Sequence, residues 1–357
     1  MRPIDFLSST PAYMQLYQSF RDDIINGIYP YGTKLPSKRV AAEQTGVSVI
    51  TVEHAYEILC DEGYLESRCR SGYFVVYRLQ ESFSVPLSQP LLTKSSPTEI
   101  SEDALPYSVL AKSYRRVLSE YKDRLLCRCP NSGCEELRQA LASYLARSRG
   151  IFVSPEQIII GSGSEYLYGL VVQLLGRTRR YAVEHPSYEK IFEVYRANGA
   201  SCDRLCMGKD GILSSELSRT DASVLHITPF NSYPSGVTAS ASKRHEYILW
   251  AKNRNGIIVE DDFDSEFTML SKAEETVFSL DPHRVIYMNT FSRTVAPSIR
   301  VGYMILPDKL VPLFGETLGK FSCTVPVFEQ CLLAELIAKG DFERHINRVR
   351  RKRRKGK

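Results

Sequence analysis

No long hydrophobic run occurs in this sequence. Nowhere do about eighteen apolar residues follow one another, which excludes a membrane-spanning helix of the usual kind. The N-terminal segment MRPIDFLSSTPAY also lacks the apolar stretch of a signal peptide, so we expect a cytoplasmic protein with no membrane partner. Apolar residues form 43% and charged residues 24% of the 357 residues, which excludes a disordered, collagen-like or disulfide-stapled chain.

The cysteines lack the pattern of a disulfide set or a zinc site. Their number, nine, is odd, so they cannot all be paired within one chain. The clusters Cys127-x-Cys129-x4-Cys134 and Cys202-x3-Cys206 lack the paired spacing and the nearby histidines that a zinc site needs. We therefore expect reduced thiols and no metal site.

The net charge of +5 comes from the end of the chain. Residues 344–357 hold nine Lys and Arg and no acid, whereas the rest has 37 basic against 41 acidic residues. Such a basic segment can bind nucleic acid, be the solvated end of a helix, or be the edge of an interrupted chain. The length of the chain predicts two or three domains.

The first stretch of the chain predicts three helices and a two-stranded wing. Apolar residues follow helical spacing over 13–27. Residues 37–46 and 48–62 each begin with a serine that can cap a helix, and 64–67 and 73–77 suit short strands. This order predicts a winged helix-turn-helix whose third helix enters the major groove of DNA. A small helical module that binds other proteins remains the alternative.

The same stretch resembles the winged helix of the GntR family. The matching landmarks are Leu35-Pro36-Ser37-x-Arg39, Gly46-Val47-Ser48, Thr51-Val52, Ala55-Tyr56, Glu62-Gly63 and Ser71-Gly72. The resemblance implies a double-stranded DNA operator as partner. The DNA-contacting residues that we expect, from this resemblance and the clustered charge, are Ser37, Lys38, Arg39, Ser48, Val49, Thr51, Arg70 and Gly72.

One of these positions departs from the family pattern. The family commonly has arginine directly after the serine that begins the third helix, where this chain has Val49. A bidentate arginine–guanine contact contributes about 1–3 kcal/mol of discrimination, and valine can instead touch the methyl group of thymine. We therefore expect weaker DNA binding or an altered sequence preference.

Residues 105–343 alternate helical stretches with short, β-branched strands. Helical stretches such as 165–175 and 242–253 lie between several of them. Such strands suit a mostly parallel sheet buried on both faces, so we predict an α/β fold for this part. The strands that we expect are 157–160, 180–183, 223–227, 256–260, 285–289 and 302–306.

Composition and pattern together divide the chain into four parts. Residues 79–104 are rich in Ser, Pro and Thr with weak periodicity, as in a linker. The predicted parts are a winged helix at 12–78, a linker at 79–104, an α/β domain at 105–343 and a basic tail at 344–357.

Three local patterns in the α/β part suit a phosphorylated cofactor. Residues 160–165, IGSGSE, form a Gly/Ser turn between a strand and a helix, where backbone amides attract phosphate. The acidic run at 257–264 follows a buried strand, at the edge where open α/β sheets hold ligands. Arg300 can clamp a phosphate. A metal site, a solvated acidic loop and a structural salt bridge are the alternatives.

Together these patterns resemble the fold-type I aminotransferases, and more closely the MocR/GabR-type regulators, which fuse such a domain to a GntR winged helix. The resemblance covers residues 12–350. It rests on Asn131-Ser132-Gly133, Leu137-Arg138, Glu184-His185-Pro186-Ser187-Tyr188, Thr228-Pro229, Pro234-Ser235-Gly236, Glu260-Asp261-Asp262-x-Asp264, Thr290-Phe291-Ser292 and Arg300-Val301-Gly302-Tyr303.

The resemblance implies a transcription regulator, a homodimer and pyridoxal 5'-phosphate as cofactor, with an amino compound as a further effector. It places Ser164 and Glu165 at the phosphate turn, Tyr188 on the pyridine ring, Asp261 at the ring nitrogen and Arg300 on the phosphate. The full set of cofactor-binding residues that it implies is Ser164, Glu165, Tyr188, Asn231, Asp261, Ser292 and Arg300.

Departures from the family pattern concern the chemistry of this site. Arg293 occupies the position of the Schiff-base lysine, and arginine is too basic to offer a neutral amine. Phe263 replaces a tyrosine whose hydroxyl would bond the cofactor's ring oxygen. We therefore expect no catalytic residue and at most noncovalent cofactor binding. A decayed relative without effector sensing and an active aminotransferase are the two alternatives.

The match to the family ends early. The family continues beyond about Arg354 into a smaller domain, so the resemblance implies a chain truncated at its C-terminus with an incomplete small domain. We expect this loss to expose the apolar residues Leu332, Leu333, Leu336 and Ile337, which would impair folding.

Overall fold

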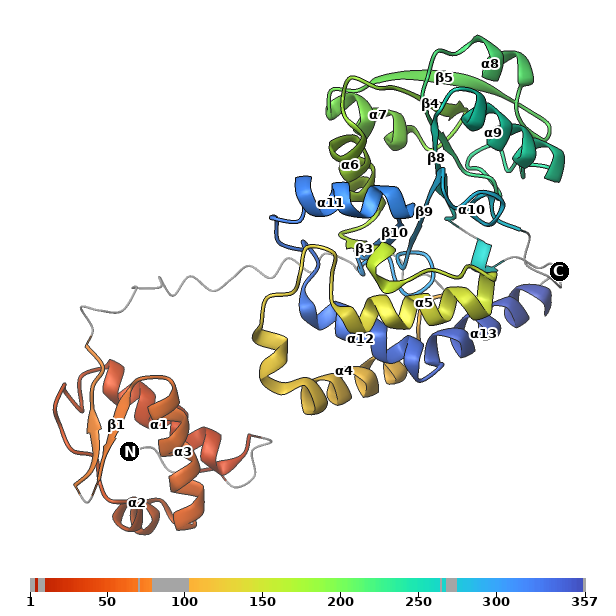
Figure 1. The fold of residues 1–357 in the computed structure, drawn as a ribbon. Coiled ribbons are helices and arrows are strands. Elements are labelled where there is room, and N and C mark those ends of the chain that lie inside the picture. Colours follow the sequence, from red (N-terminus) through yellow and green to blue (C-terminus); the bar gives the residue numbers. More distant parts are fainter. Residues whose placement is uncertain are drawn as a thin grey trace. The chain divides into compact units, whose positions relative to one another are not determined.

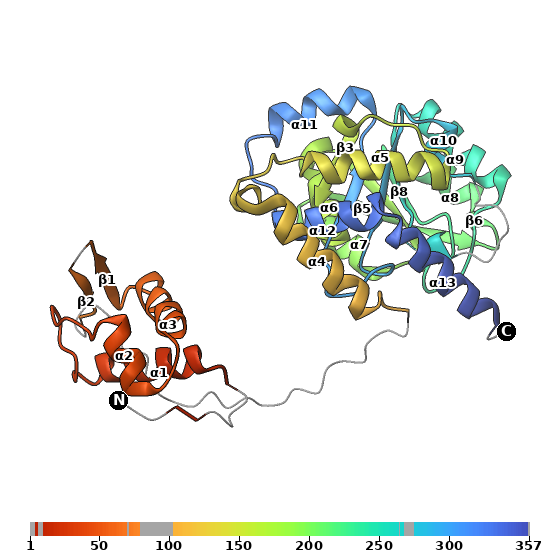
Figure 2. The same cartoon turned by 90° about the horizontal axis from the view of Figure 1, so that it is seen from below.

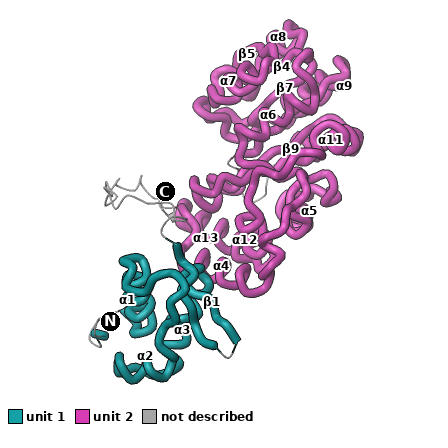
Figure 3. The backbone as a smooth tube through the Cα atoms, turned by 90° about the vertical axis from the view of Figure 1, so that its left-hand side faces the viewer, with its two compact units in different colours: residues 1–96 teal, residues 97–357 magenta. Residues whose placement is uncertain are grey.

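The computed structural model describes residues 4–5, 10–69, 71–78, 103–263, 265–267 and 275–355. The chain forms two compact units, residues 1–96 and 97–357 (Figures 1 and 3). Arg70, Asp264 and nearly all of the expected linker lie outside the described residues. In the described part, no helix is long and apolar enough to cross a membrane.

The first unit is a winged helix, as predicted. Its helices are α1 (Ala12–Ile25), α2 (Lys38–Thr45) and α3 (Val49–Asp61), and its wing is β1 (Leu65–Arg68) paired antiparallel with β2 (Gly72–Val75). The apolar faces of the three helices and the wing share one core. The largest buried side chains of that core include Leu16, Phe20, Tyr56 and Leu59.

Two serines fix where α2 and α3 begin. Ser37 Oγ accepts a hydrogen bond from the backbone N–H of Val40 at 3.3 Å, and Ser48 Oγ accepts one from Thr51 at 3.1 Å. Each serine thus satisfies one of the N–H groups that have no partner within the first turn of a helix. The predicted starts of both helices are confirmed.

Within the described residues, the second unit is built on one sheet of eight strands. The order across the sheet is β3-β10-β9-β8-β7-β4-β5-β6, and the antiparallel pairings are those of β10 with both neighbours and of β6 with β5. The predicted mostly parallel sheet is confirmed. Its strands are β3 (Ile158–Gly161), β4 (Arg180–His185), β5 (Ser201–Gly208), β6 (Gly211–Ile212), β7 (Val224–Ile227), β8 (Ile257–Asp261), β9 (Val285–Thr290) and β10 (Gly302–Ile305).

The strands β5 and β6 were not predicted from the sequence. Most side chains of β5 are at least partly exposed, and several are polar, so the segment lacks the continuous apolar pattern of the inner strands. β6 has only two residues. Both strands lie at one end of the sheet, where a strand has less to bury.

Helices cover both faces of this sheet (Figures 1 and 2). Alternate residues of each inner strand point to opposite faces: Ile258 belongs to the core on one face of the sheet, whereas Val259 belongs to the core on the other. The helices of this unit are α4 (Tyr107–Tyr121), α5 (Glu135–Arg149), α6 (Ser164–Leu175), α7 (Glu189–Ala197), α8 (Ser214–Arg219), α9 (Ala241–Asn253), α10 (Val277–Leu280), α11 (Val311–Thr317), α12 (Val327–Ala338) and α13 (Asp341–Lys355). Short 3-10 helices lie at η1 (Lys122–Leu126), η2 (Pro155–Gln157), η3 (Ser265–Phe267) and η4 (Asp308–Leu310).

The expected exposure of α12 is wrong. Leu332, Leu333, Leu336 and Ile337 are all buried in the larger core. The reason is that α12 packs against α4, α5 and α13, which enclose it from several sides. The apolar residues that the sequence suggested would be exposed therefore form part of the core of this unit.

Residues 344–355 of the basic segment belong to α13. Phe342, Ile346 and Val349 are buried along one face of this helix. Arg353 Nη2 lies 2.8 Å from Asp103 Oδ2, which ties the helix to the segment that enters α4. The segment is thus an amphipathic helix packed on the core, with several of its cations in solvent.

Candidate functional site

The polar side chains predicted to bind a cofactor lie along one edge of the sheet. The carboxyl ends of β3, β4, β7, β8 and β9 meet at this edge because these strands are parallel. β10 runs the other way, so it begins at the same edge, and its first residue Gly302 lies opposite both Gly161 and Thr290. Arg300, which precedes β10, therefore joins the turns that follow the parallel strands.

Arg300 lies over the Gly/Ser turn. Gly163 has a φ of +90°, which strains any residue with a side chain, and a Cβ added there would lie 3.0 Å from Arg300 Nη2 and crowd the guanidinium. Ser164 and Glu165 begin α6 directly after this glycine. The structure thus brings a guanidinium and the N-terminus of a twelve-residue helix together, and both attract phosphate.

Glu165 and Tyr188 share a basic neighbour. Lys190 Nζ lies 2.7 Å from Glu165 Oε1 and 6.0 Å from the centre of the Tyr188 ring. Hydrogen bonding by Lys190 lowers the pKa of Glu165, so this carboxylate is ionised and engaged at neutral pH. Tyr188 precedes α7 and its side chain is exposed at the edge of the sheet.

Asp261 is the last residue of β8, at this edge of the sheet, and it is buried. The hydroxyl of Tyr168 donates a hydrogen bond to Asp261 Oδ2, and His226 Nε2 lies 3.8 Å from the same oxygen. The Tyr195 hydroxyl is hydrogen-bonded to the other ring nitrogen of His226, Nδ1, at 2.7 Å. Burial raises the pKa of Tyr168 well above its ordinary value, so this phenol remains a hydrogen-bond donor. Among the described residues, His226 Nε2 is buried without a hydrogen-bond partner.

Sequence analysis did not identify Tyr168 and His226. One signal was available for Tyr168, because a residue four positions after Ser164 lies on the same face of the helix. His226 is the only charged or polar residue in the otherwise apolar strand β7. A buried polar side chain next to a buried carboxylate is a mark of a binding site.

Asn231 and Ser292 belong to loops that also reach this edge. Asn231 has a φ of +47°, and its backbone N–H donates to Thr238 Oγ1 at 3.1 Å. Ser292 Oγ donates to the carbonyl of Ile299 at 3.2 Å and so closes the loop that carries Arg293. Arg293, which the family resemblance places at the position of the Schiff-base lysine, is exposed.

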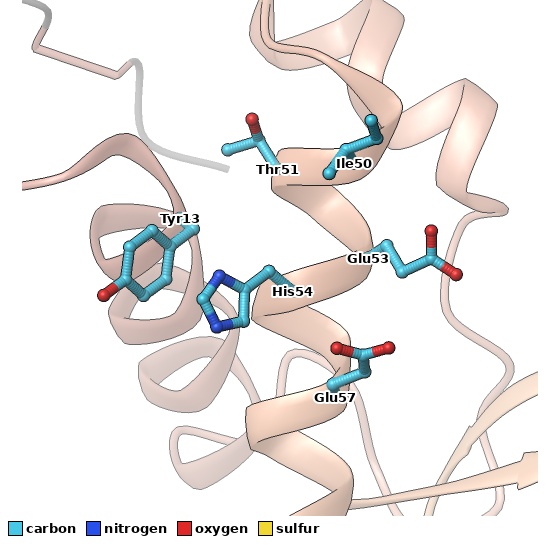
Figure 4. Close-up of a pocket in the computed structure, with 6 residues that line it drawn as sticks. All are labelled: Tyr13, Ile50, Thr51, Glu53, His54 and Glu57. Carbon is cyan, nitrogen blue, oxygen red and sulfur yellow. The ribbon is translucent and has the colours of Figure 1, made fainter.

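The first unit presents apolar side chains at the start of α3. Val49 is 40% exposed and Ile50 is 76% exposed, so the helix offers two exposed aliphatic groups at its start. Figure 4 shows Ile50 and Thr51 at this end of the helix. The Thr51 and Ser48 hydroxyls are hydrogen-bonded to each other at 2.8 Å.

The basic residues near α3 differ in how they are engaged. Lys38 Nζ forms a 2.5 Å ion pair with Glu53, whereas Arg39 is exposed. Gly72, with a φ of +109°, lies under the side chain of Lys34, because a Cβ there would be 3.0 Å from Lys34 Cε. Lys34, in the loop before α2, therefore places its positive charge beside Gly72 of the wing. Arg70 lies outside the described residues.

A shallow hollow lies between α1 and α3 (Figure 4). Tyr13 and His54 stack there with ring centres 4.2 Å apart. Glu53 and Glu57 line the same hollow. Two carboxylates repel phosphate, so this hollow does not suit the DNA backbone.

Comparisons with known proteins agree with this architecture. The gntR family of bacterial regulatory proteins matches residues 12–75, and aminotransferase class I and II matches residues 108–353. The uncharacterized HTH-type transcriptional regulator YdeL of Bacillus subtilis is 33% identical over 98% of this chain and 79% of its own length. The probable rhizopine catabolism regulatory protein MocR of Rhizobium meliloti is 28% identical over 98% of this chain and 76% of its own.

Solved aminotransferases share the fold of the second unit. The kynurenine aminotransferase of Pyrococcus horikoshii, solved in complex with PMP, is 25% identical with a TM-score of 0.61 and covers 69% of this chain. The match spans 64% of that structure, which is less than two thirds of its length. The fold is therefore that of the fold-type I aminotransferases. The chain belongs to the HTH-type transcriptional regulators of the MocR type, in which a GntR domain precedes an aminotransferase class I and II domain.

Proposed function

We propose that this chain binds a DNA operator and that its aminotransferase-like unit holds pyridoxal 5'-phosphate without a covalent bond and without catalysing transamination. The observation that carries this proposal is a set of residues, Arg300, Gly163 and Asp261, that would contact the two ends of the cofactor and that we call the cradle. Arg300 lies over Gly163 at one end, and Asp261 is buried at the other. Arg293 stands where a lysine would attach the cofactor.

The residues of the cradle fit the two polar ends of this cofactor. Arg300 and the amides that begin α6 would hold the phosphate. Asp261, oriented by the Tyr168 hydroxyl, would accept a hydrogen bond from the protonated ring nitrogen. Tyr188 would cover the ring. When bound, the cofactor supplies an electron sink for reactions at an amino carbon.

Arg293 is compatible with cofactor binding but not with covalent attachment of the cofactor. A covalent bond to the cofactor's aldehyde needs a neutral amine, and a guanidinium is protonated at every physiological pH. The same side chain cannot carry the proton that a transaminase moves. We therefore infer that the second unit senses the cofactor, or an amino compound beside it, and does not turn it over.

The first unit would supply the DNA contacts. The start of α3, with Val49 and Ile50, would face base edges in the major groove, and Lys34 and Arg39 would face phosphates. We propose that the chain acts as a homodimer, so that two such helices meet two half-sites. Light scattering of the purified chain, with and without pyridoxal 5'-phosphate, tests this assembly.

A titration with pyridoxal 5'-phosphate tests the cofactor proposal. The purified full chain is titrated and followed by absorbance, then reduced with borohydride and weighed as the intact protein. We expect saturable binding and no mass adduct. An adduct at a lysine of the site would contradict the noncovalent proposal, and no binding by a folded chain would favour the decayed relative.

Arg300→Ala identifies the site within that titration. Losing a charge-assisted contact to phosphate costs about 1.5–3 kcal/mol, so we expect affinity to fall by about ten-fold to a hundred-fold. Arg254→Ala is the matched control, because Arg254 precedes β8 and so lies at the opposite edge of the sheet. Equal loss in both variants would argue against the cradle.

A further inference from the structure

Four of the nine cysteines meet where three segments of the second unit come together. Cys129 follows η1, Cys134 precedes α5, Cys323 lies between α11 and α12, and Cys331 is on α12. They interact in pairs: Cys129 neighbours Cys134 and Cys323, and Cys134 neighbours Cys331. Within the described ranges no three such side chains converge as metal ligands would.

The side chain of Gln330 holds this cluster together. Its Nε2 lies 3.4 Å from Cys129 Sγ and 3.6 Å from Cys323 Sγ, while its Oε1 accepts the backbone N–H of Cys134 at 2.7 Å. Gln330 is fully buried, so its amide has a fixed position. Two sulfurs that share one amide nitrogen are neighbours, although 194 residues separate them in the chain.

Burial and hydrogen bonding distinguish the members of the cluster. Cys129 and Cys323 are partly exposed, whereas Cys134 and Cys331 are buried. Hydrogen bonds from the Cys134 thiol, the Cys323 thiol and the Gln330 amide lower the pKa of Cys129. The thiolate is the nucleophilic form of cysteine, so Cys129 is both accessible and activated.

We propose that Cys129 and Cys323 form a modification site for hydroperoxides, which oxidise the pair to a disulfide. The Cys129 thiolate attacks one peroxide oxygen, becomes the sulfenic acid and releases hydroxide. The Cys323 thiol then attacks the sulfenic sulfur, the S–S bond forms and water leaves. One hydrogen peroxide thus takes two electrons from the two thiols and yields two waters in all.

The site touches the turn that carries the cradle. Cys323 Sγ lies 3.8 Å from the carbonyl oxygen of Ile160, and the neighbouring Thr324 Oγ1 lies 3.0 Å from Ser162 Oγ. A disulfide shortens the Cys129–Cys323 separation to a bond of about 2.05 Å. The proposal therefore includes a changed environment for residues 160–163 after oxidation.

The test treats the reduced, full-length chain with one equivalent of hydrogen peroxide. We expect loss of two thiols, a mass decrease of about 2 Da and a cross-linked peptide that joins Cys129 to Cys323. Faster oxidation of the exposed Cys69, Cys127 or Cys206, or a cross-link within any other pair, would overturn the proposal. This measurement needs no variant, so it does not depend on the folding of one.

Serine variants then assign the two roles. Cys323→Ser should leave Cys129 as a sulfenic acid that dimedone traps, and Cys129→Ser should abolish rapid oxidation. Cys206→Ser, which removes an exposed thiol outside the cluster, is the matched control. Hydrogen exchange of the amides of residues 160–163 completes the test. Unchanged exchange after disulfide formation would remove the proposed effect on the turn, whether or not the chain binds pyridoxal 5'-phosphate.

Discussion

The two units depart from their families in different ways. In the winged helix the scaffold residues remain, and the departure is the exposed aliphatic pair at the start of α3. In the aminotransferase-like unit the proposed cradle residues Arg300, Gly163 and Asp261 are present, and the departure that the family resemblance implies is at Arg293. The first unit would differ in the DNA sequence that it prefers. The second unit would differ in the reactions that it can perform on a bound cofactor. On the proposed function, recognition of a ligand and its chemical conversion are separate properties in this chain.

We expect the largest effect from Arg293→Lys, which removes the difference between the second unit and its family at this position. The variant places a primary amine at the position where the family has its lysine, so covalent attachment becomes possible. We expect the borohydride-stable adduct to rise from none to about one per chain, measured by intact mass. Arg254→Lys, which adds an amine at the opposite edge of the sheet, is the control. No adduct in the folded Arg293→Lys variant would mean that the departure extends beyond this residue.

Core truncations separate the stabilities of the two units. Leu59 in the first unit and Leu332 in the second are both fully buried, and truncation of such a leucine to alanine costs about 2–5 kcal/mol. The single tryptophan, Trp250, lies in the second unit and reports on that unit alone. We expect Leu332→Ala to lower the denaturant midpoint of Trp250 fluorescence.

Leu59→Ala is the counterpart measurement. It should shift the circular dichroism transition but leave the Trp250 transition in place. A shift of Trp250 fluorescence in Leu59→Ala would show that the units unfold together.

Val49→Arg sharpens the difference in the first unit. Arginine at this position can bond O6 and N7 of guanine, a contact that contributes about 1–3 kcal/mol of discrimination. Selection from a random double-stranded DNA library should give sites with guanine where we expect the unchanged chain to prefer thymine. Ile28→Arg adds the same charge at an exposed position outside α3 and should strengthen binding without changing the preferred sequence. Identical preferences in all three proteins would contradict the placement of α3 on DNA.

The second unit should also lose stability as pH rises. Burial raises the pKa of Glu184, Glu260 and Glu266 to about 8, above the ordinary value near 4.5. Between these values the folded chain holds protons that the unfolded chain releases, so the free energy of unfolding falls with increasing pH until about pH 8. The limiting slope is about 1.4 kcal/mol per pH unit for each such group.

Melting followed by Trp250 fluorescence at about pH 6 and about pH 8 measures this slope. Glu184→Gln keeps a hydrogen-bonding partner for Ser232, 2.7 Å away, and removes one titrating group, so its slope should be smaller. A stability that rises over this interval would show that these carboxyls are ionised in the folded chain.

Much of this architecture could be predicted from local sequence signals. Ser37 and Ser48 mark helix starts because a hydroxyl in that position satisfies the free N–H groups of the first turn. The inner strands of the sheet are apolar because both of their faces are covered. Such signals depend on neighbours in the chain and need no tertiary information.

The features that escaped prediction depend on contacts between distant segments. Asp261 meets Tyr168 and His226 only when β8, α6 and β7 are assembled. The burial of Leu332 likewise depends on α4 and α5, and the cysteine cluster joins segments from both ends of the second unit. Periodicity identifies the face of an element that is apolar, but it does not identify the element that covers that face.

The reversed strand β10 has a consequence for the order of events during synthesis. Gly163 leaves the ribosome 137 residues before Arg300, and the two meet only when β10 is inserted between β3 and β9. Such a long loop must close before its contacts form, so this is a late step in the folding of a domain. On the proposed function, a nascent chain can therefore hold phosphate at this site only after its central sheet has closed.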